Sequence, residues 1–98
     1  MTRKPLTLPA LLRELRIEQG TSLRSAAVDL GVDPSYLSRL ERGEKGASEQ
    51  MLRRAALLYE VPEEMLALAE GRLPDDIVAI FQQNPELIDE LRARFEED

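Results

Sequence analysis

The chain contains no cysteine, no histidine and no tryptophan. Without cysteine it can form no disulfide and offers no thiolate ligand to a metal. Without histidine it lacks the side chain that most often acts as a general base and as the nitrogen ligand of zinc. We therefore expect no enzymatic activity, no bound metal and no cofactor.

Long apolar segments are also lacking. No run approaches the ~20 apolar residues that span a membrane. The first residues, 1–5, are not followed by the apolar core of a signal peptide. We expect a cytoplasmic protein.

Aromatic residues are few, with two Phe and two Tyr, and nowhere do β-branched or aromatic residues alternate over the length of a strand. Leu, Ala, Glu and Arg dominate instead, and all four are strong helix formers. With 98 residues, the chain is short for a domain of about 100–200 residues. The composition predicts one small all-α domain, alone or with a short appendage.

Apolar residues recur at helical spacing in five segments before Gly71. We expect these helices to open at Thr7, at Thr21 or Ser22, at Asp33, at Ser48 and at residues 60–62, and Gly20, Gly31, Gly43 and Gly71 to end four of them. The predicted inward positions are Leu8, Leu11, Leu12, Leu15, Leu23, Ala26, Ala27, Leu30, Leu37, Leu40, Leu52, Ala55, Ala56, Tyr59, Val61, Met65 and Leu68.

Two further helices are predicted after Gly71. One begins at residues 74–76, residues 84–85 break it, and the last starts at Glu86. We therefore divide the chain into a domain of residues 1–71 and an appendage of residues 72–98.

The segment from Gly20 to Gly43 predicts two short helices joined by a tight turn, the sequence form of a helix-turn-helix. Ala27 is small enough for the helices to cross closely, and Gly31 lets the chain reverse. The second helix leaves hydroxyl and arginine side chains on its outer face, and such a face can enter a DNA major groove. The outward positions are Pro34, Ser35, Tyr36, Ser38, Arg39 and Arg42.

In this segment the chain resembles the phage-repressor family of the Cro/C1 or XRE type. The matching positions are Gly20, Ala27, Gly31, Leu37, Ser38, Leu40, Glu41 and Gly43. The resemblance implies a five-helix lambda-repressor-like DNA-binding domain, with the two-helix appendage behind it. It also implies a transcriptional regulator of a bacterium or phage that binds double-stranded DNA.

The resemblance implies which side chains meet DNA. The base-reading positions become Pro34, Ser35, Tyr36, Ser38 and Arg39. Pro34 has no side-chain donor for a hydrogen bond to a base, and we expect Ser35 and Arg39 to carry most of the readout. The phosphate contacts become Ser22, Arg24, Arg42 and Lys45, and the structural ion pair becomes Arg16 with Glu41. The chain departs from the family at Leu23, where many members carry a phosphate-binding glutamine, and at Ala47, where they carry a proline.

Alternatives stay open for some of these residues. Arg39 and Arg42 are alternatively solvated surface arginines, and Tyr36 alternatively covers the rim of the core. Arg3 and Lys4 form either a basic arm along the DNA or an ordinary chain end. Acidic residues at 60, 63, 64, 75 and 76 lack the spacing of a calcium loop, so we expect a solvated face there.

The appendage has too many apolar residues for all of them to be exposed to solvent. An apolar surface of this size indicates an interface or a core. We expect a dimer interface formed by Ile77, Ile80, Phe81, Ile88, Leu91 and Phe95. The protein would then be a homodimeric repressor on a palindromic operator. The alternatives are that the two helices fold back on the five-helix domain, or that they bind another protein, as in an antitoxin-like or adaptor module.

The net charge of −6 hides an uneven distribution. Residues 1–46 hold eight basic and six acidic residues, a balance of +2, whereas residues 47–98 carry −8. The surplus acid would repel DNA from the second half of the chain and turn the helix-turn-helix toward the phosphates.

Overall fold

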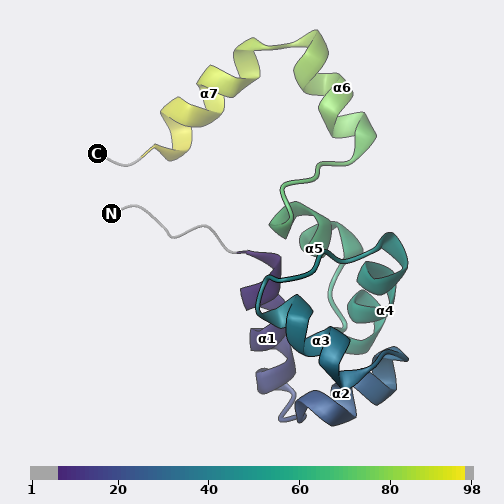
Figure 1. Ribbon diagram of the computed structural model, residues 1–98. Helices are drawn as coiled ribbons and strands as arrows, with labels where there is room; N and C mark the ends of the chain where they lie inside the picture. The colour runs from purple at the N-terminus through teal and green to yellow at the C-terminus, as the bar shows by residue number, and fades with distance from the viewer. Residues whose placement is uncertain (1–6, 97–98) are drawn as a thin grey trace. The chain divides into compact units, whose positions relative to one another are not determined.

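The computed structural model describes residues 7–96, and the regular structure among them is entirely helical (Figure 1). The helices are α1 (Leu8–Glu18), α2 (Leu23–Leu30), α3 (Pro34–Glu41), α4 (Glu49–Tyr59), α5 (Glu63–Ala69), α6 (Asp75–Gln83) and α7 (Glu86–Phe95). The expected all-α class, with five helices followed by two, is confirmed. Arg3 and Lys4 lie outside the described residues.

The chain divides into two compact units between Arg72 and Leu73. In the first, called the five-helix unit, α1 packs on α3, α4 and α5, while α2 packs on α3 and α4. In the second, called the tail, α6 packs on α7.

Local signals explain where the helices of the five-helix unit begin and turn. The hydroxyl oxygens of Ser22 and Ser48 accept hydrogen bonds from the backbone N–H groups of Ser25 and Met51, each at 3.1 Å, which caps α2 and α4. Gly31 ends α2 with φ +72°, a left-handed conformation that favours glycine. The starts of α2 and α4 and the end of α2 therefore lie where the sequence predicts.

The core of the five-helix unit consists mainly of leucine and alanine. Its buried side chains are Leu8, Leu11, Leu12, Ala26, Ala27, Leu30, Leu37, Leu40, Met51, Leu52, Ala55, Ala56, Tyr59 and Leu66. Leu15, Leu23 and Val61 are partly buried against this cluster. Met51 and Leu66 are core residues that the sequence pattern did not indicate.

The expected inner face of α5 was wrong. Met65 is 40% exposed and Leu68 is 56% exposed, whereas Leu66 is fully buried at 0%. The sequence pattern counted helical turns from Val61, but Pro62 is the extended N-cap residue and α5 begins at Glu63. Val61 thus precedes the helix, and its position does not set the phase of the turns that follow.

At two predicted helix starts the structure differs in detail from the expectation. Asp33 occupies the N-cap position of α3, but its side chain makes no capping hydrogen bond. Glu60 belongs to the end of α4, as its C-cap with φ +54°, and does not open α5. A non-glycine residue in this left-handed region is strained.

The tail has no buried residue in α6 or α7. Ile80, Ile88, Leu91 and Phe95 are all more than 40% exposed. Within the tail, an apolar hollow of about 460 Å³ is lined by Leu73, Val78, Phe81, Gln82 and Ile88. None of the described helices has the length and apolar character needed to cross a membrane.

Candidate nucleic-acid interface

The helix-turn-helix is formed by α2, a short turn and α3. The N–H groups of Gly31 and Val32 donate to the carbonyls of Val28 and Ala27, at 3.1 and 2.9 Å, and this closes the end of α2. Ala27 is fully buried, and its single methyl group lets the two helices pack closely. The turn thereby fixes the direction of α3 relative to α2.

A second contact holds this turn from α4. The Arg54 guanidinium donates from Nη1 to the Leu30 carbonyl at 3.2 Å, at the C-terminal end of α2 where helix carbonyls lack partners. A Cβ added to Gly31 would lie 3.3 Å from the same Nη1 atom. The φ angle therefore favours glycine at position 31, and any larger residue would also have to displace the Arg54 guanidinium slightly.

α3 has one buried and one accessible side. Leu37 and Leu40 are buried in the core, while Ser35 and Arg39 are exposed. The three other predicted base-reading residues, Pro34, Tyr36 and Ser38, are half-buried. Of the five predicted base-reading residues, Ser35 and Arg39 are thus the two that are exposed to solvent.

Tyr36 lies at the rim of the core, which is one of its two predicted positions. It packs against the core cluster of the five-helix unit, and it remains partly accessible. A ring in this position can cover the core and still contact DNA.

The predicted phosphate-binding residues are all exposed on the five-helix unit: Ser22, Arg24, Arg42 and Lys45. The Ser22 oxygen accepts from Ser25 N–H, so its own hydroxyl hydrogen remains to be donated to a phosphate. Arg42 Nε lies 3.3 Å from Glu44 Oε2, and both side chains are more than half exposed. Such a surface ion pair contributes little to the stability of the fold. A DNA phosphate can therefore replace Glu44 as the partner of Arg42.

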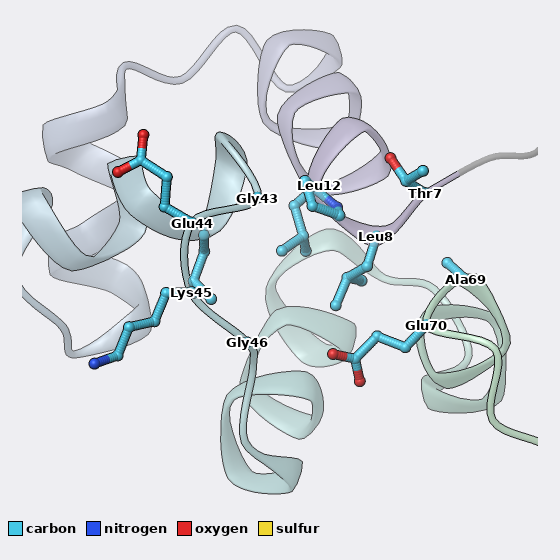
Figure 2. A pocket seen from close by; sticks show the side chains of 11 residues that line it. Thr7, Leu8, Leu12, Gly43, Glu44, Lys45, Gly46, Ala69 and Glu70 are labelled. Atoms are coloured by element: carbon cyan, nitrogen blue, oxygen red, sulfur yellow. The ribbon is translucent and has the colours of Figure 1, made fainter.

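Lys45 lies in the loop between α3 and α4, beside a small pocket of about 280 Å³. Leu8, Leu12 and Gly46 line this pocket, and Figure 2 shows the Lys45 side chain extending away from them. The ammonium group is therefore accessible to a ligand outside the pocket.

Arg16 of α1 and Glu41 of α3 are brought together in a fork-shaped ion pair. Arg16 Nε donates to Glu41 Oε2 at 2.8 Å, and Nη2 donates to Oε1 at 3.0 Å. The side chains are only 14% and 5% exposed, respectively. The hydrogen bond to Glu41 raises the pKa of Arg16, and desolvation opposes this effect.

The same arginine also holds the start of the helix-turn-helix. Its Nη1 donates to the Thr21 carbonyl at 3.0 Å, immediately before α2. The pair therefore joins α1, the residues before α2, and the end of α3. Its geometry supports a structural role, in which it sets the position of α3.

The comparisons with known proteins agree with this arrangement. A family model described as a helix-turn-helix domain matches residues 8–69. The chain belongs to this helix-turn-helix family. The match covers α1 to α5.

Several solved structures resemble the chain. A crystal structure of the clp gene regulator ClgR from Corynebacterium glutamicum is 30% identical, with 72% of this chain and 92% of that chain covered and a TM-score of 0.58. A second ClgR structure is 26% identical, with 95% of each chain covered and a TM-score of 0.60. A structure of the SinR protein/SinI protein complex is 25% identical, with 93% of this chain and 100% of that chain covered and a TM-score of 0.60.

None of the curated proteins matches the sequence. The family match and the regulator structures together identify a DNA-binding transcriptional regulator of the helix-turn-helix family.

Proposed function

We propose that this regulator is a homodimeric repressor that binds a palindromic operator through α3 of each copy. The observation that carries the proposal is the two-sided character of α3, which buries Leu37 and Leu40 while Ser35 and Arg39 stay exposed. Two such helices, placed about 34 Å apart, would enter successive major grooves on one face of the duplex. Occupancy of an operator that overlaps a promoter would then block transcription.

Within α3, we assign base readout chiefly to Arg39 and Ser35. An arginine can donate two hydrogen bonds to O6 and N7 of guanine, worth about 1–3 kcal/mol of discrimination. Ser22, Arg24, Arg42 and Lys45 would contact phosphates, which set the position of the protein without specifying sequence.

The test of this assignment compares Arg39→Ala with Arg42→Ala. Selection of bound duplexes from random oligonucleotides by the wild-type protein first supplies the operator. Arg39→Ala should then weaken operator binding by about 1–3 kcal/mol and relax the preference at one base pair. Arg42→Ala should weaken operator and random DNA alike, and reduce the salt dependence. Equal losses on both DNAs for Arg39→Ala would reject its assignment as a base reader.

The proposed dimer forms through the tail. Ile80, Ile88 and Phe95 are exposed there, and a small pair of short helices with this much accessible apolar surface gains stability by covering it. We include Ile77, Phe81 and Leu91 in the same interface.

Sedimentation equilibrium tests the dimer. The wild-type mass should be that of two chains, and Ile88→Glu should shift it to one, because a buried unpaired charge is costly. The monomeric variant should keep its weak binding to random DNA but lose affinity for the two-half-site operator. A wild-type protein that is monomeric while bound to that operator would contradict the proposal.

A second candidate function is that of a protein-interaction module whose tail binds a different protein. It is favoured by the likeness to a structure in which SinR is in complex with the SinI protein. Fluorescence anisotropy with random duplex DNA separates the two functions. Steeply salt-dependent binding supports the repressor, and no binding even at low salt supports the interaction module.

A further inference from the structure

A surface hollow of about 370 Å³ lies among α1, α2 and the C-terminal end of α3. Its lining residues are Arg13, Arg16, Leu23, Ser38, Glu41 and Arg42. Arg13 is exposed and lies one helical turn before Arg16 on α1. The sequence pattern gave Arg13 no role.

The charges around this hollow leave an excess of positive charge. Both carboxylate oxygens of Glu41 accept hydrogen bonds from Arg16, so these two residues neutralise each other. The remaining charged residues of the lining are Arg13 and Arg42. Two guanidinium groups that line one hollow repel each other, and an anion between them removes the repulsion.

Neither guanidinium is committed to a strong partner. Arg13 has no ion-pair partner among residues 7–96. Arg42 has only its exposed contact with Glu44, at 3.3 Å. Both are therefore available to an external anion at little cost.

Ser38 adds a hydroxyl donor to the same hollow. It is half-buried on α3, whereas the exposed Arg39 next to it does not line the hollow. Ser38 thus shares the lining of the hollow with Arg13 and Arg42, and neither Ser35 nor Arg39 belongs to that lining.

We propose that this hollow receives one phosphate of the DNA backbone, held by Arg13, Arg42 and the Ser38 hydroxyl. The inference rests on the proposed function, since it adds a contact to the same DNA interface. A phosphate matches the donor set because guanidinium groups bind phosphate oxygens through paired N–H donors. The hollow also leaves space for waters that complete the remaining hydrogen bonds. Ser38 thereby becomes a phosphate contact in place of a base reader.

The first experiment measures the binding of full-length protein to a random-sequence duplex over a series of salt concentrations. Arg13→Gln should bind about tenfold more weakly, and the slope of log K against log salt should be shallower by about 1. Arg53→Gln is the matched control, because it removes the same charge from an exposed arginine of α4 that pairs with Glu49 and Glu63. The control should retain the wild-type slope.

The outcomes separate this inference from the proposed function. If the wild-type protein binds no duplex DNA even at low salt, the proposed function fails. If the wild type binds and Arg13→Gln has the slope of the Arg53→Gln control, only the phosphate site is overturned. Thermal unfolding of each variant, followed by circular dichroism, should match the wild type, since Arg13 is exposed.

A second experiment tests Ser38. Ser38→Ala should weaken binding to the selected operator and to random DNA by the same factor, and selection from random oligonucleotides should return the wild-type sequence preference. A changed preference at any base pair would return Ser38 to the base-reading residues and overturn its place in the phosphate site.

Discussion

The five-helix unit and the tail are built from helices of similar length, but only the first has an interior. The five-helix unit buries leucine and alanine side chains from all of its helices. In the tail, neither α6 nor α7 has a buried residue. Isolated helices of fewer than about 12 residues are marginal in water, so burial of apolar side chains has to supply the stability. The five-helix unit provides this burial by itself, whereas the two helices of the tail do not.

The two units differ in polar contacts as well. The five-helix unit contains the shielded Arg16–Glu41 pair and long-range hydrogen bonds such as Gln19 Nε2 to the Leu58 carbonyl at 2.8 Å. The ion pair described within the tail, Arg92 with Asp89, is exposed and one turn apart at 3.5 Å. Long-range contacts fix the helices of one unit relative to each other, and local contacts do not.

The largest expected effect on the free energy of unfolding comes from truncating a buried side chain of the core. Leu52 is 1% exposed, and Leu52→Ala should lower the free energy of unfolding by about 2–5 kcal/mol, through lost burial and the cavity left behind. Urea unfolding followed by tyrosine fluorescence measures this, because Tyr36 and Tyr59 both lie in the five-helix unit. Phe95→Ala in the tail should change the same value by less than about 0.5 kcal/mol. A loss for Phe95→Ala as large as that for Leu52→Ala would show that the tail stabilises the five-helix unit directly.

The next effect concerns the shielded ion pair. Glu41→Ala leaves the largely buried Arg16 without its carboxylate partner, and we expect a loss of about 3 kcal/mol in the free energy of unfolding. The comparison variant Asp89→Ala removes the exposed tail pair and should cost less than about 0.5 kcal/mol. The same urea titration compares them, and equal losses would contradict the difference between the units.

The smallest effect is specific to high pH. Burial, reinforced by the negative charge of Glu41, raises the pKa of Tyr59 to about 12, against about 10 in the unfolded chain. The unfolded chain therefore loses this proton first. The stability linked to it is complete below pH 10 and is lost as the pH rises from 10 toward 12, by up to about 2 kcal/mol.

Tyr59→Phe isolates this contribution. The Tyr59 hydroxyl has no hydrogen-bond partner among the described residues, so its removal should leave stability at pH 7 unchanged or raise it by about 1 kcal/mol. Urea unfolding at pH 8 and pH 11 should show a smaller loss for the variant than for the wild type. Identical pH dependence in the two proteins would exclude the titration of Tyr59 as its source.

Much of the fold was predictable because helix ends carry local signals. Ser22, Gly31 and Ser48 act on backbone groups within one turn of themselves, and the structure has them as cap residues. The wrong expectation that Met65 and Leu68 face the core also has a local physical cause. A periodic pattern is valid only inside one continuous helix, and the extended Pro62 separates Val61 from α5.

Sequence alone determined the all-helical class and the helix-turn-helix, because periodicity and caps depend on neighbouring residues. The family resemblance supplied Ser35 and Arg39 as the candidate reading side chains. Only the tertiary structure decided that Leu66 fills the core and that Arg13, Ser38 and Arg42 line one hollow. These relationships join residues from different helices. They depend on where the helices cross, and that is set by the packing of the whole core.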